Sequence, residues 1–313
     1  LTVHCCSDCN SEVDRLDAMR AFVTVAERGS FVEAARRLRL SPAAVTRAVA
    51  QLEDHLGLSL LHRTTRAVRL SERGALYVDH CRRVLDDIAD AERAVRGEDA
   101  APRGTLTVAA PLMFGRLHVL PVLARLLGEH RALSVRLLLS DRLVHLVEEG
   151  VDAAVRIGQP ADSSLIAIKV GEVRRVLVAS PAYLAAHGMP QSPADLAGHA
   201  LVAFEGVDFT SEWRFGGTRP LTLRIEPRLA VNSADAAIAA AEAGLGITRT
   251  LSYQVHEAVQ AGRLRLVLDG FAPPGVPVQV VYPPGRRGAA NVTAFMHAAR
   301  AHFATLPMLA APD

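Results

Sequence analysis

Near the N-terminus, hydrophobic residues recur at the spacing of short helices. The first run comprises Leu16, Met19, Phe22, Val23 and Ala26. Steps of three and four residues place these side chains on one helical face. Gly29 follows directly, and glycine is the residue that most often ends a helix. The pattern predicts a first helix that stops at Gly29.

A second helix is predicted to begin at once. Ser30 is a preferred residue ahead of a helix, and Glu33 three residues later completes a capping box, in which each side chain satisfies a free backbone N–H of the other. The inner face that follows is small, with Ala34, Ala35 and Leu38. Small side chains allow a neighbouring helix to approach closely.

The third helix has the most sharply defined start. Ser41 is a preferred N-cap, and Pro42 suits the first helical position because its missing N–H had no partner there. The apolar face comprises Val45, Ala48, Val49, Leu52 and Leu56. The opposite face is flat and comprises Ala43, Thr46, Arg47, Ala50 and Gln51. A solvated face would usually carry several Glu and Lys residues, whereas a helix in the major groove of DNA needs small groups and a few donors.

A β-hairpin with two basic side chains is predicted after this helix. Within the segment LSLLHRTTRAVRL, the alternating apolar residues are Leu61, Val68 and Leu70. They surround a polar two-threonine turn, which is typical of a hairpin. Arg63 and Arg66 flank that turn and would form a wing that grips phosphate or the minor groove. Three helices and this hairpin make a winged helix-turn-helix.

A long helix is predicted from Ser71, its cap, toward Val95. Alternating steps of four and three residues relate Tyr77, Cys81, Val84, Ile88, Ala91 and Val95. Such a seam is typical of a coiled coil and predicts pairing with a second copy of the chain. The alternative is a single amphipathic helix packed on its own domain. Cys81 is most simply a small buried apolar residue, with a redox role as the alternative.

Beyond Arg96 the pattern changes class. Residues 97–103 contain glycine, proline and charge and are predicted to form a hinge. Strand-like runs then alternate with helical stretches, which indicates βαβ units and a mostly parallel sheet. The strand-like runs are residues 105–110, 134–140, 151–157, 175–180, 229–233 and 244–248, with a helix over 234–243 between the last two.

Composition narrows the class of protein. With 313 residues, half of them apolar, the chain can form two or three compact units. No apolar run reaches the roughly 18 residues of a membrane span, and the first residues do not resemble a signal peptide. We therefore expect a cytoplasmic protein with no membrane partner. His4, Cys5, Cys6 and Cys9 are poorly spaced for zinc, so residues 1–13 are predicted to be a disordered extension without metal.

Positive charge is concentrated near the N-terminus although the whole chain carries only +2. Residues 15–73 hold eleven arginines against six acidic residues, a net +5, and residues 74–100 hold four against seven, a net −3. A basic surface attracts phosphates, but +5 also fits an ordinary solvated surface, so charge alone does not decide.

The residues from Phe22 to Gly74 resemble the DNA-binding end of the LysR-type transcriptional regulators. The shared motifs are SFxxAA at the second helix, S-P-x-x-V-T-R at the third, LExxLG at its exit, and L-x-R-x-x-R in the wing before L-S-E-x-G. The resemblance implies base and backbone contacts from Ser41, Pro42, Ala43, Thr46 and Arg47, with Arg63 and Arg66 on the wing. It further implies that Ser30 and Phe31 set the second helix against the DNA backbone.

The rest of the chain resembles the effector-binding domain of the same family. The resemblance is carried by DRLVHLVEEGVDAAVRIG, RRVLVASPAYLAAHG, SPADLAGHALVAF, EWRF and AAEAGLGI. It implies two α/β subdomains similar to type 2 periplasmic binding proteins, with a cleft between them and chain crossings near Arg175 and Val280. The expected division is a DNA-binding domain over 14–73, a linker and dimerisation helix over 74–96, the hinge, an effector domain over 104–306 and a tail over 307–313. Within the effector domain, subdomain I holds 104–174 and 280–306, and subdomain II holds 175–279.

Ligands in open α/β sheets bind beyond the carboxyl ends of strands and at helix starts. That rule selects Pro111, Leu112, Met113, Ser140, Asp141, Arg156, Ile157, Gly158, Phe204, Glu205, Asn232, Ser233, Ile247 and Thr248. We expect about half of them to line a cleft. Arg156 would attract an anion, or would instead pair with Asp141 or Glu205. The chain departs from the family at Arg249, where small apolar residues are common, and this change is expected to alter either the cleft or the surface between subunits. It also has Ala132 where a proline often precedes the strand, which is expected to change the turn geometry and not the fold.

Taken together, the sequence predicts an α+β multidomain regulator. It has a winged helix-turn-helix, a long linker helix and a two-subdomain effector-binding domain. The expected partners are an interrupted palindromic promoter site on double-stranded DNA, a second copy of the chain as homodimer or homotetramer, and RNA polymerase. A small-molecule effector of unknown identity is expected, and no cofactor. The chain lacks G-x-S-x-G, a P-loop, G-x-G-x-x-G after the first strand and H-E-x-x-H, so an enzyme is not expected.

Overall fold

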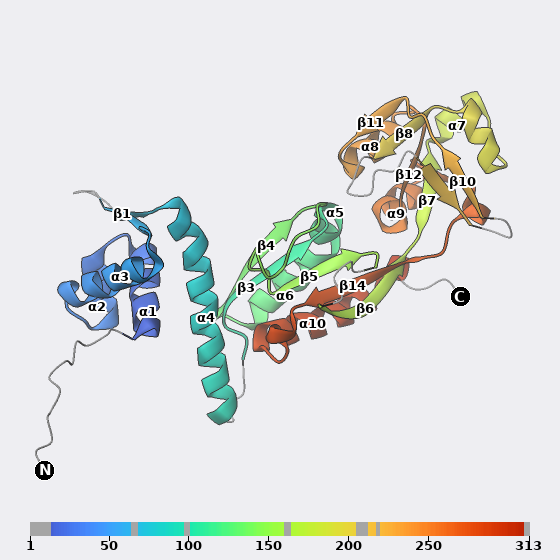
Figure 1. Ribbon diagram of the computed structural model, residues 1–313. Helices are drawn as coiled ribbons and strands as arrows, with labels where there is room; N and C mark the ends of the chain where they lie inside the picture. Colours follow the sequence, from blue (N-terminus) through green and yellow to red (C-terminus); the bar gives the residue numbers. More distant parts are fainter. Residues whose placement is uncertain are drawn as a thin grey trace, which may run out of the picture. The chain divides into compact units, whose positions relative to one another are not determined.

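The computed structural model describes residues 14–63, 68–96, 101–159, 164–204, 212–216 and 220–309. Contacts divide the chain into two compact units, Leu1–Ala100 and Ala101–Asp313. Both units are drawn in Figure 1. In the part of the chain that the structure describes, no helix is long and apolar enough to cross a membrane.

The first unit contains short helices, a two-stranded hairpin and a long helix (Figure 1). Their bounds are α1 Arg15–Arg28, α2 Phe31–Leu38, α3 Pro42–Leu56, β1 Leu61–Arg63, β2 Val68–Leu70 and α4 Glu72–Arg96. Gly29 and Gly57 end α1 and α3 in the left-handed conformation, with φ of 63° and 67°. Strands β1 and β2 are antiparallel, with Leu61 opposite Leu70. The predicted order of helices and hairpin is confirmed.

One core holds the short helices, the hairpin and the start of α4 together. Its fully buried side chains include Phe22 of α1, Val49 and Leu52 of α3, and Leu60 just before β1. The apolar face predicted for α3 is therefore the face that packs inward. Burying each such side chain stabilises the unit by roughly 1.5–3 kcal/mol relative to exposure, before the entropy of ordering is subtracted.

The predicted capping box at α2 forms only by half. Ser30 Oγ accepts a hydrogen bond from the Glu33 N–H at 3.4 Å, as expected. The Glu33 carboxylate, however, accepts from Arg36 Nη1 at 2.7 Å. An arginine one turn along the helix offers a charge-assisted bond, which is stronger than a bond to a neutral backbone N–H.

The second unit contains two five-stranded sheets and a separate hairpin. The strands are β3 Gly104–Ala110, β4 Leu133–Leu139, β5 Ala153–Ile157, β6 Ile166–Val173, β7 Arg175–Ala179, β8 Leu201–Phe204, β9 Glu212–Phe215, β10 Leu221–Arg224, β11 Leu229–Val231, β12 Ile247–Leu251, β13 Arg265–Val267 and β14 Val276–Tyr282. The α-helices are α5 Leu112–Phe114, α6 Leu120–Glu129, α7 Pro181–His187, α8 Ala234–Glu242, α9 Ser252–Gln260 and α10 Ala290–Phe303. Further helical turns are η1 Gly115–Val119, η2 Pro193–Gly198, η3 Asp269–Phe271, η4 Pro284–Arg286 and η5 Pro307–Leu309.

Both sheets are mixed, which corrects the prediction of a mostly parallel sheet. The first has the order β4-β3-β5-β14-β6, and the second has the order β11-β8-β12-β7-β13. Among the described strands, β3 is parallel to β4 and β5, and β8 is parallel to β11 and β12. The remaining pairs, which involve β14 and β7, are antiparallel. These are the strands next to the crossings between sheets, where the chain reverses without a βαβ unit.

The chain changes sheet twice within the second unit. The first crossing is at Arg174, between β6 and β7, next to the predicted position at Arg175. The second lies between β13 and β14, ahead of the predicted position at Val280. Val280 is instead in the middle of β14, opposite Val155 of β5 and Ile168 of β6. The prediction placed the crossing too late because it did not recognise β6, the partner that keeps all of β14 in the first sheet.

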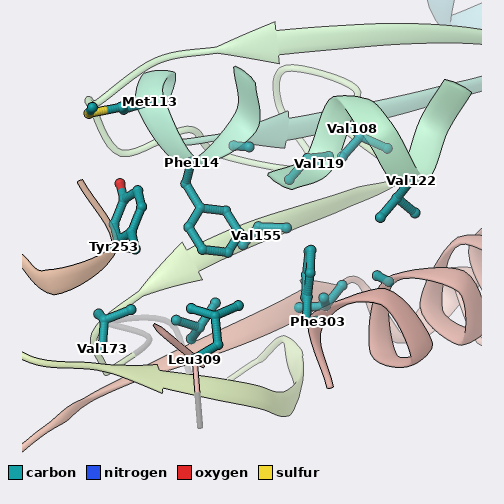
Figure 2. Close-up of a cluster of buried hydrophobic side chains, with 14 of the residues drawn as sticks. Val108, Met113, Phe114, Val119, Val122, Val155, Val173, Tyr253, Phe303 and Leu309 are labelled. Atoms are coloured by element: carbon teal, nitrogen blue, oxygen red, sulfur yellow. The ribbon is translucent and has the colours of Figure 1, made fainter. Parts of the chain in front are cut away.

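Aromatic side chains form the centre of the second unit's main core (Figure 2). The Phe114 ring lies 5.2 Å from the Tyr253 ring and 5.4 Å from the Phe303 ring, both edge to face. Figure 2 shows Phe114 pointing from α5 toward Val155 of β5, with Tyr253 beside it and Phe303 entering from α10. Tyr253 belongs to α9, which follows the second sheet's strand β12. The core thus joins elements associated with both sheets.

Candidate functional site

The outward face of α3 is exposed and carries mainly short side chains, as predicted. Ala43 and Arg47 are exposed and Thr46 is half-buried. Ser41 Oγ accepts from the Ala44 N–H at 3.1 Å, so the predicted cap is present and fixes where the helix starts. Thr46 Oγ1 donates to the Pro42 carbonyl at 2.8 Å. That bond uses the hydroxyl proton within the helix and leaves the threonine methyl group and oxygen lone pairs for other contacts.

The hairpin beside α3 is attached through backbone groups. Glu53 of α3 accepts from the Leu60 N–H at 2.7 Å and from the Leu61 N–H at 3.1 Å. On the other side, Ser71 Oγ donates to the Ser59 carbonyl at 2.8 Å and accepts from the Gly74 N–H at 2.9 Å. These bonds fix the position of the hairpin between α3 and α4. Arg66 lies outside the described residues, as does the side chain of Arg63.

The residues predicted to line a pairing seam on α4 have different environments. Cys81 is only 1% exposed in the core of its own unit, with Tyr77 packed against that core. Cys81 is therefore covered by its own domain, which corrects its assignment to a direct contact with a second copy. Farther along, Ile88 is half-buried and Val84 and Val95 are exposed. The side chain of Ala91 lies outside the described residues.

The Cys81 thiol is poorly suited to redox chemistry. Burial raises its pKa to about 11, and the neighbouring Tyr77 hydroxyl has a pKa raised to about 12, again mainly by burial. Because the thiolate is the reactive form, a raised pKa makes the residue less reactive at neutral pH. The environment of Cys81 favours a structural role.

A cavity of about 450 Å³ lies in the second unit at the ends of strands from both sheets. The first sheet contributes the carboxyl ends of β3 and β5 and the segment after β4. The second sheet contributes the carboxyl ends of β8 and β12 and the start of β7. Of the predicted effector residues, the walls include Pro111, Ser140, Asp141, Arg156, Ile157 and Phe204.

The remaining predicted effector residues do not line the cavity among those described. These are Leu112, Met113, Gly158, Asn232, Ser233, Ile247 and Thr248. Ile247 and Thr248 are completely buried within the second sheet, and Ser233 Oγ caps α8 by accepting from the Ala236 N–H at 3.4 Å. Leu112 contributes indirectly, because its N–H donates to Asp141 Oδ1 at 3.0 Å. Glu205 lies outside the described residues.

Several cavity residues were not selected from the sequence. They are Arg142, Gln159, Arg175, Trp213, Ile225, Arg249, Thr250, Leu251, Tyr253, Gln254 and neighbouring apolar residues. Arg249 had one signal, its departure from the small residues common in the family. Trp213 belongs to the EWRF motif of the family resemblance, but the rule for strand ends did not select it, because it lies on the β9–β10 hairpin and not at the end of a strand in either sheet.

The described walls of the cavity are rich in positive charge. Four arginines, Arg142, Arg156, Arg175 and Arg249, contribute to them, with Asp141 as the acidic residue. Arg156 Nη2 donates to the Val144 carbonyl at 2.7 Å, which holds its side chain against the wall. Burial, and then the nearby Arg175, lower the pKa of Arg249 to about 10. A cavity with these groups favours an anion over a cation.

The described residues offer no metal site, since they contain no group of three or more His, Cys, Asp or Glu placed to hold an ion. The candidate zinc ligands His4, Cys5, Cys6 and Cys9 lie outside the described residues.

Two family models match the chain. The model of the LysR substrate binding domain matches residues 99–304, and the model of the bacterial regulatory helix-turn-helix protein, lysR family, matches residues 16–75. A HTH-type transcriptional repressor of Pseudomonas aeruginosa is 36% identical over 299 residues, which make up 94% of this chain and 94% of that protein.

Solved structures of full-length regulators have the same fold. CrgA, a LysR-type transcriptional regulator from Neisseria meningitidis, matches with a TM-score of 0.60 at 30% identity, over 92% of this chain and 98% of CrgA. The Vibrio cholerae virulence activator AphB matches with a TM-score of 0.58 at 26% identity, over 92% of this chain and 99% of AphB. Both the DNA-binding part and the larger part are therefore shared with regulators of one family.

Proposed function

Because the chain belongs to the LysR family of bacterial transcriptional regulators, we propose that its α3 helix reads an interrupted palindromic promoter site. A homodimer places one α3 in each half-site, and two dimers form a homotetramer. Because promoter DNA in bacteria lies in the cytoplasm, the protein acts there. The chain is a regulator and not an enzyme.

The observation that carries this proposal is the shape of the α3 surface. Ala43, Thr46 and Arg47 project from a helix whose opposite face is buried and whose start is fixed by Ser41. Small groups allow the helix to approach base edges closely, and Arg47 is the one long donor of the predicted reading set on α3. Arg63 and Arg66 of the hairpin would add contacts to the DNA backbone, and Ser30 and Phe31 would place α2 against it.

Replacing Arg47 by alanine tests the reading role. A footprint on DNA flanking the protein's own gene first identifies a site, and binding to that site is then compared with binding to scrambled DNA of the same length. A bidentate arginine–guanine contact contributes about 1–3 kcal/mol of discrimination. We expect the ratio of specific to non-specific affinity to fall by about 5- to 150-fold.

Arg28→Ala is the matched control, because it removes one exposed arginine from the end of α1 in the same unit. We expect it to weaken both affinities through charge and to leave their ratio unchanged. Unchanged discrimination by Arg47→Ala, with an unaltered circular dichroism spectrum, contradicts the role given to α3.

Pairing of two copies is proposed to use the exposed side of α4. Val84 is 41% exposed and Val95 is 90% exposed, although both are apolar. Val84→Glu places a charge on this side while sparing the buried Cys81 side. Sedimentation at several concentrations should show weaker self-association than the wild type, whereas the control Glu72→Gln, an exposed change on the other side of α4, should not. Equal association by Val84→Glu contradicts this use of α4.

The second unit is proposed to bind the effector in its cavity, with RNA polymerase as the partner through which bound effector alters transcription. A ligand changes the output only if it binds one arrangement of the protein better than another. Pro111, Ser140, Asp141, Arg156, Ile157 and Phe204 are proposed as wall contacts. Transcription from the footprinted promoter, with purified polymerase and candidate metabolites, tests the coupling.

A further inference from the structure

Two arginines share one face of the second sheet at the cavity. In the antiparallel pair of β12 with β7, Arg249 is opposite Leu177 and Leu251 is opposite Arg175. Directly opposite residues point to the same side, and so do residues two apart along a strand. Arg249 and Arg175 are therefore diagonal neighbours on one face, and both line the cavity.

The Arg249 side chain is held by an aromatic ring and surrounded by apolar groups. Its Cζ atom lies 5.3 Å from the centre of the Trp213 ring, which is a cation–π contact. Ala203, Phe204, Ile225 and Leu251 form neighbouring parts of the cavity wall. The contact with Trp213 holds the guanidinium group beside the ring, and its N–H groups can still donate to a ligand.

Carboxylates do not neutralise this pair among the residues that the structure describes. Neither Arg249 nor Arg175 has an ion-pair partner there, and Arg175 is a cause of the lowered Arg249 pKa. Asp141, the acidic residue of the described walls, accepts from the Leu112 N–H. Two neighbouring cations in a partly desolvated site repel each other, and a bound anion removes that repulsion.

A neutral donor lies close to the same end of β12. Gln254 Oε1 accepts from Thr250 Oγ1 and from the Leu251 N–H, the latter at 2.9 Å. Both bonds use the amide oxygen, and Gln254 also forms a side-chain hydrogen bond with Tyr253. An amide NH₂ group carries two protons, so one N–H can still donate to a ligand in the cavity. An anion at this end would meet two guanidinium groups and one amide.

We propose that Arg249 and Arg175 bind the carboxylate of a small organic acid, whose apolar body packs against Phe204, Ile225 and Leu251. The planar guanidinium fork matches a carboxylate in a bidentate arrangement. The apolar walls favour an organic acid over a bare inorganic anion, because they would be left without contacts by the latter. This inference rests on the proposed function in one respect, that the cavity ligand is the effector.

Four probes of known chemistry separate the charge from the apolar body. Benzoate supplies both, benzamide supplies the same body without charge, acetate supplies the carboxylate alone, and inorganic phosphate supplies an inorganic anion. Trp213 is the single tryptophan of the chain and lies against Arg249, so its fluorescence reports binding directly. Isothermal titration calorimetry on the full chain measures the affinity independently.

We expect saturable benzoate binding, with each other probe at least about tenfold weaker. Arg249→Gln should weaken benzoate binding by about 10- to 100-fold, since it removes charge-assisted hydrogen bonds. Arg249→Lys keeps the charge but loses the fork and should fall between the wild type and Arg249→Gln. Arg265→Gln, an exposed change on β13 outside the cavity, should leave binding unchanged.

Several outcomes overturn the proposal. Benzamide binding as tightly as benzoate removes the role of the carboxylate, and phosphate binding in place of benzoate assigns the site to an inorganic anion. Equal benzoate affinity in the wild type and a folded Arg249→Gln, or no binding of benzoate to the wild type, also refutes it. Specific DNA binding is measured on the same samples. If the wild type binds its DNA site specifically but does not bind benzoate, only this inference is refuted. If the wild type shows no specific DNA binding, the proposed function is refuted.

Discussion

Gly74 is the position where a single methyl group should do most damage to the first unit. It lies in the first turn of α4, where the helix passes the residue that precedes β1. A Cβ at this position would be 1.9 Å from Leu60 O and 2.8 Å from Leu60 C. Ordinary contact begins near 3.4 Å, so Gly74→Ala requires the two backbones to separate by about 1.5 Å.

The cost of that separation can be worked from the bonds that Leu60 makes. Its carbonyl accepts from the Ser71 N–H at 2.9 Å, and its own N–H donates to Glu53. Overpacking costs about 1–3 kcal/mol, and leaving one buried backbone group without its partner costs about 1–3 kcal/mol more. The higher helix propensity of alanine relative to glycine offsets about 0.5–1 kcal/mol of this loss in the free energy of unfolding. We expect a net loss of about 1–5.5 kcal/mol in the free energy of unfolding of the first unit.

Urea unfolding of the full chain with two probes measures this loss. Far-UV circular dichroism includes the helical first unit, whereas the fluorescence of Trp213 follows the second unit only. Gly74→Ala should shift the dichroism transition to lower urea and leave the fluorescence transition unchanged. The matched control is Gly128→Ala in α6, where a Cβ meets nothing within 4 Å, and it should be neutral or stabilising. If Gly74→Ala unfolds at the same urea concentration as the wild type, the close approach is not a constraint.

Three further predictions concern single side chains. Glu53→Ala removes the acceptor for the N–H groups of Leu60 and Leu61 and should lower the stability of the first unit by about 1–3 kcal/mol in the same assay. Glu53→Gln should recover part of this stability. An unchanged transition in Glu53→Ala would show that the hairpin does not need this acceptor. Ser41→Ala removes the α3 cap and should cost about 0.5–2 kcal/mol, which would be contradicted by unaltered unfolding. His118 is buried beside Tyr253 and near His302, and burial lowers its pKa to about 4. Because the unfolded chain takes up this proton below pH 6.5 and the folded chain does not, stability falls by up to about 3 kcal/mol between pH 6.5 and 4. His118→Phe should lose less stability over that range, and an identical pH profile would rule His118 out as a cause.

The first unit was largely predictable because its signals are local. Ser41, Pro42 and Gly57 mark the ends of α3 within the chain itself, and the apolar spacing between them identifies the buried face. The sequence did not show which of two possible hydrogen-bond partners a side chain would choose. Glu33 was expected to complete a capping box, but Arg36 takes its carboxylate. The pattern of residues shows which bonds are available and does not show which of two acceptable partners is nearer.

The second unit was predictable in class and not in topology. Buried strands such as β3 and β5 are easily recognised in the sequence by their apolar runs. These runs do not show whether the neighbouring strand is parallel or antiparallel. Strand β6 is hard to recognise from the sequence because its pattern, IAIKVGEV, includes two charged residues and one glycine in a half-exposed strand. Without β6, the long pairing of β14 could not be anticipated, and the second crossing was placed inside β14.

The cavity was predictable on one wall more than on the other. Pro111 and Ser140 follow strands whose ends the sequence marks, and Arg156 lies near the end of β5, so the general rule for open sheets found them. Arg175 and Trp213 reach the cavity from the start of a strand that runs the opposite way and from a separate hairpin. Their position depends on the topology that the sequence left open, which is why the arginine pair emerges only from the strand register.

The chemistry of that pair bears on how a ligand could change the protein's state. The two sheets are joined near the cavity by an ion pair between Arg116 of η1 and Asp235 of α8 at 3.3 Å, with both side chains about half exposed. An exposed pair of this kind contributes about 0–1 kcal/mol. A carboxylate held by Arg249 gains charge-assisted bonds of about 1.5–3 kcal/mol, but only in an arrangement that also keeps its apolar body against the walls. An energy of about 1.5–3 kcal/mol corresponds to about 10- to 150-fold in an equilibrium and exceeds the ion-pair term. A ligand that is held by Arg249 on the second sheet and also reaches Ile157 on the first sheet's wall would shift the balance of arrangements by that factor.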